Sequence, residues 1–321
     1  RCVRSPGANR GAGVGVVLRA TGFVVGFEFA ARRRLAVTPQ VRSTRSTWRV
    51  LLLLTLVLCT VGCGSGAAGV PTPTWQASTA VVEDLQVVAS DSLTPAIQAA
   101  ASAYQRDHPE VQITVLPRAS SLASRALQQG DADVAVVTWL AGDLPEDAWI
   151  QPVSRDGLAV VVNSRNGLPG ATMTQLQELF QGRLEDWATW GGLPGPPRLV
   201  SRETASGAYA FFQAWVMRDA RVTLNALLAP STQAVLDFVA DEPLAVGYAS
   251  TARLDGRVRA VAVNGVPPSK EAIAAGLYPM TRTHFVVTLS EPDGAARGFV
   301  QWLLADPGQS VLEAHGFVAA P

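Results

Sequence analysis

Short apolar runs that end in small polar residues alternate with amphipathic segments from residue 85 onward. Apolar runs of this kind predict buried strands, and they lie at 85–90, 111–117 and 133–137. Between them, 93–109 and 120–130 repeat apolar residues at helical spacing, with Pro95 in a first turn and Gly130 at an end. This order of strand and helix predicts an α/β fold whose parallel strands are joined by right-handed crossovers.

The same alternation continues to the C-terminus. Strands are predicted at 156–166, 197–202 and 244–250, and two more on either side of a proline-rich bend within 258–290. Helices are predicted at 172–192 with a break at Gly182, from Ser206 onward, at 231–239, and once or twice within 293–317. The chain therefore contains enough strand–helix units for two α/β lobes.

Four polar loops follow predicted strands. They read ASDSLTP (89–95), RASS (118–121), VVTW (136–139) and SRETASG (201–207). In open α/β sheets, ligands bind at the carboxyl ends of the strands. We therefore expect these loops to meet in one binding site.

The loop SRETASG has the features of an anion cradle. Ser206 and Gly207 precede an apolar helix, and the first N–H groups of a helix lack internal partners and carry partial positive charge. Arg202 lies just upstream and offers charge-assisted hydrogen bonds. The simpler alternative is an ordinary helix cap beside a solvated arginine.

Charge is unevenly distributed along the chain. Residues 1–62 contain ten arginines and one acid, whereas the remainder has 16 Lys plus Arg against 25 Asp plus Glu, a balance of −9. An acidic body argues against a nucleic-acid partner. It does not exclude a small anion, because local donors in a dry cleft outweigh distant charges screened over about 8–10 Å.

Residues 41–62 resemble a secretory signal, with three arginines before an apolar segment too short to span a bilayer. Cys63 follows small residues, as in a bacterial lipobox, so we expect a lipoprotein anchored through acylated Cys63; a plain secretory signal is the alternative. Residues 1–40 are interpreted as a non-native upstream extension, and 63–83 as a flexible tether. This organisation predicts an extracytoplasmic protein.

The sequence contains no motif that indicates catalysis or metal binding. All three cysteines precede residue 64, so no disulfide is expected in the body. The histidines lie outside the four loops, which disfavours a hydrolase built on Ser206 or Ser120. We expect a monomeric binding protein that is not an enzyme and uses no metal or cofactor.

Four segments carry a family resemblance. They are the stretch 157–192 with its F-x-G-x-x-x-x-W pattern, SRETASG, LAVGYAS (244–250), and the C-terminal stretch from GLYPMTR onward. Together they resemble the phosphate-binding proteins of bacterial phosphate ABC importers, over roughly residues 85–321. The resemblance implies a two-lobed type II periplasmic-binding-protein fold in which each lobe is a mostly parallel sheet flanked by helices. Lobe 1 is expected at 84–156 plus 254–321 and lobe 2 at 157–253. It also implies that a captured oxyanion is handed to membrane permease subunits.

The resemblance assigns a ligand site residue by residue. It comprises Ser90, Ser92, Leu93 as a backbone donor, Ser120, Thr138, Arg202, Ser206, Gly207 and Ala208. Ala208 stands where the family often has threonine, so one hydroxyl donor is missing. On this assignment Arg202→Ala is expected to abolish anion binding with little effect on thermal stability.

The ligand's identity remains open at this point. Some family members have an aspartate that accepts a hydrogen bond from protonated phosphate and so rejects sulfate, but Thr138 and Trp139 occupy that region here. We therefore expect poor selectivity between phosphate and sulfate. The alternatives are the same fold binding molybdate, tungstate or sulfate, and a sensing lipoprotein that has lost tight binding.

Overall fold

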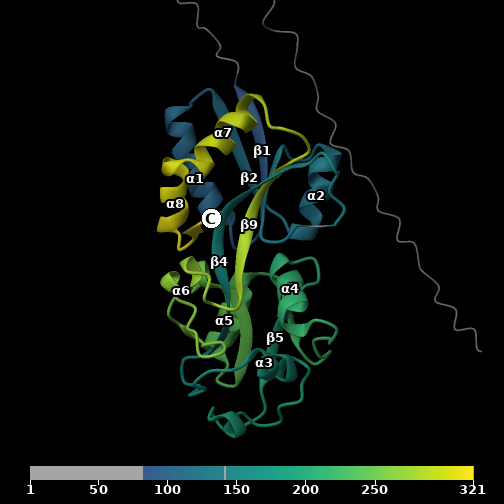
Figure 1. The fold of residues 1–321 in the computed structure, drawn as a ribbon, viewed down its shortest axis with the longest axis vertical. Coiled ribbons are helices and arrows are strands. Elements are labelled where there is room, and N and C mark those ends of the chain that lie inside the picture. Colours follow the sequence, from purple (N-terminus) through teal and green to yellow (C-terminus); the bar gives the residue numbers. More distant parts are fainter. Residues whose placement is uncertain (1–81, 141, 321) are drawn as a thin grey trace, which may run out of the picture. The chain divides into compact units, whose positions relative to one another are not determined.

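The computed structural model describes residues 82–140 and 142–320, which form a mixed α/β fold of two lobes (Figure 1). The expected α/β class is thus confirmed. The signal, Cys63 and nearly all of the tether lie outside the described residues. Within the described part, no helix is long and apolar enough to cross a membrane.

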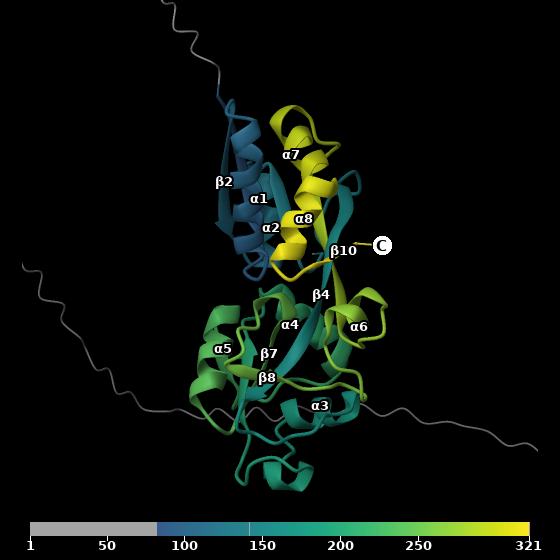
Figure 2. The same ribbon diagram turned by 90° about the vertical axis from the view of Figure 1, so that its left-hand side faces the viewer.

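The first lobe contains a parallel strand arrangement. Its early strands are β1 (Glu83–Ala89), β2 (Val111–Pro117) and β3 (Val134–Val137). Strand β1 pairs in parallel with both β2 and β3, so the expected parallel pairing is confirmed. Helix α1 (Thr94–Asp107) connects β1 to β2, and α2 (Ser120–Gln129) connects β2 to β3. Helices α7 (Gly294–Leu304) and α8 (Asp306–Ala314) return to this lobe and lie beside α1 (Figure 2).

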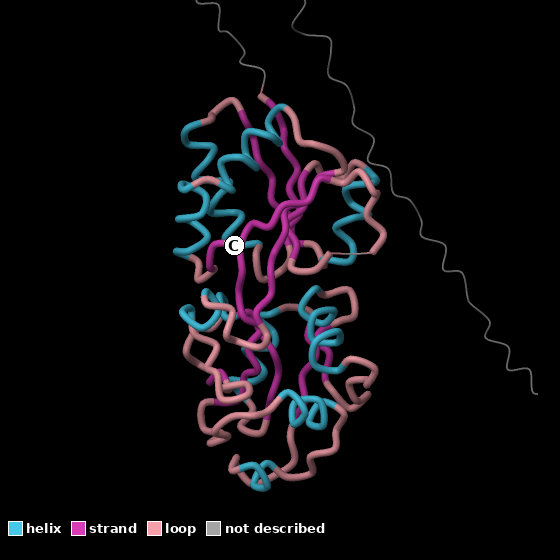
Figure 3. The backbone as a smooth tube through the Cα atoms, viewed as in Figure 1, coloured by secondary structure: helices cyan, strands magenta, loops and turns pink. Residues whose placement is uncertain are grey.

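Two strands join the lobes. Strands β4 (Trp149–Asn163) and β9 (Thr281–Thr288) pair antiparallel with each other and run from one lobe into the other (Figure 3). The sheet order is β2-β1-β3-β9-β4-β7-β5-β6, with β8 and the short β10 (Val318–Ala319) paired to β4. All pairings of β4 and β9 are antiparallel, so the sheet is more mixed than the expected mostly parallel sheets.

The second lobe repeats the α/β plan. Its strands are β5 (Arg198–Arg202), β6 (Leu227–Ala229), β7 (Ala245–Ser250) and β8 (Val258–Ala260). Its helices are α3 (Met173–Phe180), α4 (Gly207–Phe212), α5 (Thr232–Asp241) and α6 (Lys270–Ala274). A π-helical turn, Gln213–Met217, continues α4, and 3₁₀ turns occupy Trp187–Trp190 and Thr251–Arg253. Strand β5 pairs in parallel with β6 and β7.

The expected break at Gly182 is confirmed: α3 ends at Phe180, and Gly182 adopts a left-handed φ of +78° that turns the chain away. One helical expectation needs correction. Helix α6 was not predicted, because it lies within the proline-rich stretch read as a bend. Ser269 caps it by accepting a hydrogen bond from the N–H of Ala272.

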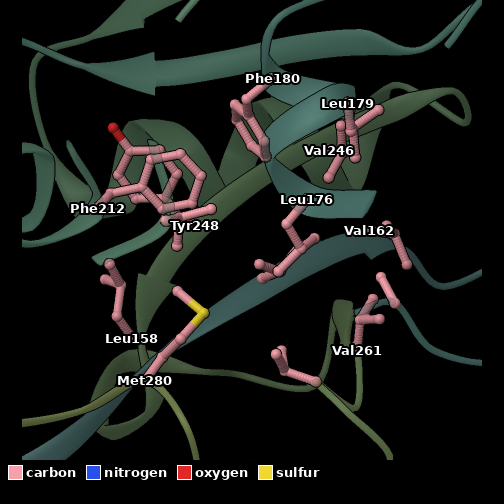
Figure 4. Packing of buried hydrophobic residues seen from close by; sticks show 14 of the residues in the cluster. Leu158, Val162, Leu176, Leu179, Phe180, Phe212, Val246, Tyr248, Val261 and Met280 are labelled. Atoms are coloured by element: carbon pink, nitrogen blue, oxygen red, sulfur yellow. The ribbon is translucent and has the colours of Figure 1, made fainter. Parts of the chain in front are cut away.

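Each lobe has its own apolar core. In the second lobe, the rings of Phe212 and Tyr248 stack at 4.2 Å and Phe180 meets Phe212 edge-on (Figure 4). Val261 and Met280 belong to the same cluster. Fully burying an apolar side chain of this size contributes about 1.5–3 kcal/mol. The boundary expected at residue 254 therefore does not match the packing, since residues 258–280 pack with the second lobe before β9 returns to the first.

Candidate functional site

A cleft of about 330 Å³ lies where loops of both lobes meet. The first lobe lines it with Ser90, Asp91, Ser92, Pro117, Arg118, Ala119, Ser120 and Thr138, and the second with Arg202, Glu203, Ser206, Gly207, Ala208, Pro230, Ser231 and Thr232. The four polar loops thus converge as the strand order predicts. Of the nine expected site residues the cleft brings together eight; that they bind a ligand stays a prediction.

Three buried hydroxyl side chains form the floor of the first-lobe side. Ser90 Oγ lies 2.7 Å from Ser120 Oγ, which lies 3.3 Å from Thr138 Oγ1. The N–H of Thr138 donates to Ser90 Oγ at 3.2 Å. Each residue comes directly after or soon after a strand, so the sheet fixes their spacing. Hydroxyl hydrogens can rotate, so this hydroxyl triad can donate to an acceptor in the cleft.

Helix α4 of the second lobe begins against this triad. A Cβ atom on Gly207 would lie 2.2 Å from Thr138 Oγ1 and 2.3 Å from Ser120 Oγ, which only a glycine avoids. Ser206 is the N-cap, and its side chain accepts from the N–H of Ala208 at 3.2 Å. Gly207 therefore allows a close approach of the two lobes at the floor of the cleft.

Leu93 is the expected site residue that does not line the cleft. Its N–H donates to the carbonyl of Ser90 at 2.8 Å, and its side chain is fully buried in the first-lobe core. It is the N-cap residue of α1. The backbone donor assigned to it is therefore already used inside the loop, whereas the neighbouring Ser92 does line the cleft.

Arg202 is buried at the end of β5, with only 3 % of its surface exposed. Its guanidinium donates to side chains of Glu203, Asp91 and Thr232 and to the carbonyls of Ala229 and Pro230. This excludes the alternative of a solvated arginine. It also means that Arg202 is integrated into the fold, so the expectation that Arg202→Ala spares stability is contrary to the packing.

Two carboxylates in the cleft were missed by the sequence reasoning, which looked for an acid only after β3. Asp91 Oδ2 accepts from Arg202 Nη1 at 3.2 Å and from the N–H of Thr232, at the start of α5, at 2.7 Å. Glu203 holds Arg202 through two bonds of 2.9 Å. The sequence did contain a signal for Asp91, because it lies between Ser90 and Ser92. A loop that places two residues in a site also brings the residue between them close to that site.

Arg118 is a second cation that sequence reasoning missed. It lines the cleft from the loop after β2, its side chain is exposed, and among the described residues it makes no ion pair. With Asp91, Glu203 and Arg202, it brings the formal charge of the cleft lining to zero. A free cation at the mouth attracts an anion even though the body as a whole is acidic.

Tyr248 forms hydrogen bonds with the last two residues of β5. Its hydroxyl bonds to Ser201 Oγ at 2.8 Å and accepts from the N–H of Arg202 at 3.1 Å. Burial raises the pKa of Tyr248 to about 12, so the phenol stays neutral. The backbone at the end of β5 is thereby fixed beneath the cleft.

The histidines of the described residues lie away from the cleft. The buried His284 instead bonds to Asp156 at 3.0 Å, where β4 and β9 cross between the lobes. No cluster of three His, Cys, Asp or Glu residues in the described part of the chain could hold a metal ion.

Comparisons with known proteins identify the family and the fold of this chain. A family model described as PBP superfamily domain matches residues 74–307. The phosphate-binding protein PstS of Pseudomonas aeruginosa is 27 % identical over 306 residues, covering 85 % of this chain and 95 % of that protein. PstS of Bacillus subtilis is 27 % identical over 241 residues, covering 73 % and 80 %.

Solved structures show the same fold. A putative phosphate ABC transporter substrate-binding protein from Clostridium perfringens, with bound phosphate, has a TM-score of 0.69 at 23 % identity, covering 74 % of this chain and all of that one. An ABC-type phosphate transport receptor from Vibrio cholerae has a TM-score of 0.65 at 24 % identity, with the same coverage. The expected two-lobed binding-protein fold is therefore confirmed.

Proposed function

Because this chain belongs to the PBP superfamily, we propose that it is an extracytoplasmic solute-binding protein that captures inorganic phosphate, or a similar tetrahedral oxyanion, between its lobes. The observation that carries the proposal is the meeting of the Ser90–Ser120–Thr138 triad with the start of α4. Hydroxyl and backbone donors from several directions suit the oxygens of a tetrahedral anion.

The strength of such a site follows from its donors. Hydrogen bonds to a charged group contribute about 1.5–3 kcal/mol each. Five or six of them amount to about 8–18 kcal/mol before the costs of association and ordering. Micromolar binding needs about 8 kcal/mol, so the bonds have to lie in the upper part of this range, since association alone costs about 4 kcal/mol or more.

A titration of the purified chain tests the proposal. Calorimetry with phosphate, sulfate, molybdate and tungstate is expected to give saturable binding of phosphate. Selectivity against sulfate is expected to be poor, because the two acids that line the cleft, Asp91 and Glu203, already accept hydrogen bonds from Arg202. Saturable binding of molybdate alone would favour the alternative ligand class. Absence of heat and of any thermal stabilisation with all four anions would support the sensing lipoprotein and refute the proposal.

We extend the proposal to the protein's partners. The names of the structural relatives, which are components of phosphate ABC transporters, support delivery of the anion to the permease subunits of an importer. Anchoring would occur through an acylated Cys63. Cys63→Ser is then expected to move the protein from the membrane fraction to the soluble fraction on cell fractionation, with Cys59→Ser as control; retention of Cys63→Ser in the membrane would contradict the anchor.

A further inference from the structure

Asp91 links the two lobes across the cleft. It belongs to the loop after β1 in the first lobe, whereas both groups that donate to its Oδ2 belong to the second. These donors are the N–H of Thr232 at 2.7 Å and Arg202 Nη1 at 3.2 Å. One carboxylate oxygen thus connects the lobes through the start of α5 and the end of β5.

A second contact between the lobes supports this closure. The N–H and Oγ of Ser121, in the first turn of α2, both donate to the carbonyl of Ala205, at 3.3 and 3.0 Å. All the atoms in the two contacts belong to the chain itself. The lobes can therefore be held together by internal groups.

The hydrogens of Arg202 are all assigned to partners within the chain. Nε and Nη2 face Glu203, its sequence neighbour, with the carbonyls of Ala229 and Pro230 sharing them. Nη1 donates to Asp91 and to Thr232 Oγ1. Of these partners, Asp91 alone comes from the other lobe, so it is the one that an opening of the cleft would remove.

We propose that Asp91 is an internal competitor of the bound anion and a latch of the closed cleft; this inference rests on the proposed function. A carboxylate oxygen and an oxyanion oxygen are equivalent acceptors, and they cannot both occupy the same donors on Arg202 and Thr232. An anion that reaches these donors must displace Asp91, and the two negative charges repel each other at short range. Asp91 therefore lowers the affinity for the anion while it holds the lobes together.

Calorimetry on the full chain in low-salt buffer tests the competition, with inorganic phosphate as the probe. Asp91→Asn keeps the size of the side chain and an oxygen that can accept from Thr232, but removes the charge. The variant is expected to bind phosphate at least about tenfold more tightly than the wild type, a change of about 1.4 kcal/mol. Asp84→Asn is the matched control, since Asp84 is an exposed acid at the far end of the same strand. Unchanged or weaker binding by Asp91→Asn would overturn the competition.

Small-angle scattering in phosphate-free buffer tests the latch independently of any ligand. Asp91→Ala removes both contacts to the second lobe and is expected to show a larger radius of gyration than the wild type and than Asp84→Ala. Equal radii for Asp91→Ala and the wild type would overturn the latch. If neither the wild type nor Asp91→Asn binds phosphate, the proposed function and the competition both fail, whereas the scattering still decides whether Asp91 closes the cleft.

Discussion

Replacing Gly207 with alanine places one methyl group at the point where the lobes meet. The new Cβ would lie 2.2 Å from Thr138 Oγ1 and 2.3 Å from Ser120 Oγ, whereas ordinary contact begins near 3.4 Å. The hydroxyls or the start of α4 must then move by about 1 Å, as the difference between these distances requires. Such a shift separates the two sets of donors that an anion has to contact together.

The expected loss of affinity follows from the donors displaced. Two hydrogen bonds to a charged ligand, each worth about 1.5–3 kcal/mol, amount to about 3–6 kcal/mol. This raises the Kd for phosphate by more than about a hundredfold. Stability is expected to change by less than about 1 kcal/mol, because a small opening of the lobes relieves the clash and alanine favours the helix that Gly207 begins.

Calorimetry and thermal unfolding without ligand measure the two effects separately. Gly142→Ala is the matched control, because a Cβ there meets nothing within 4 Å. Phosphate affinity within about twofold of the wild type in Gly207→Ala would refute the reasoning, since the triad and α4 would then not form the anion site.

Two further predictions concern buried charges. Arg202→Ala is expected to lose anion binding and about 1–3 kcal/mol of unfolding free energy, because it leaves the carbonyls of Ala229 and Pro230 without their donor; urea unfolding at wild-type stability would contradict this. Stability is also expected to fall as the pH is lowered from about 6.5. Burial lowers the pKa of His284 below its ordinary 6.5. Burial alone would raise the pKa of Asp156, but the charges of Arg282 and His284 outweigh it and hold that pKa well below 3.8. The unfolded chain therefore binds more protons than the folded chain, first at the imidazole below about pH 6.5 and then at the carboxyl below about pH 3.8. Urea unfolding of the wild type and of His284→Gln at several pH values checks the first step, whose pH dependence the variant should lose; an equal slope in both proteins would exclude His284 as its source.

Local sequence patterns were sufficient for the elements that frame the cleft. Apolar runs ending in small polar residues encode β1, β3 and β5, and the chain places Ser90, Thr138 and Arg202 at or just after their ends. These positions depend on the strand alone, so sequence reasoning could predict them. The start of α4 at Gly207 was predictable for the same reason, because Ser206 is a local cap.

Features that depend on partners distant in sequence were missed. Asp91 meets Arg202 across 111 positions, and no local pattern encodes that contact. The lobe boundary was misplaced for the same reason. Residues 258–280 lie in the chain between the strands of the second lobe and β9, and only their packing against the apolar core of the second lobe (Figure 4) shows that they belong to that lobe. Pattern arguments identify which residues end a strand, but they do not identify which lobe those residues pack against.

The division of donors between the lobes makes binding and closure one process. The triad belongs to the first lobe, and Gly207, Ala208 and Arg202 belong to the second, so neither lobe alone surrounds an anion. A ligand gains its full set of bonds only when the lobes meet, and that difference is what shifts the equilibrium toward the closed form. The contacts of Asp91 already stabilise the closed form relative to the open form when no ligand is bound. The ligand therefore shifts the equilibrium between the two forms by less than it would without these contacts. Affinity and the extent of ligand-driven closure should then increase together when the charge of Asp91 is removed.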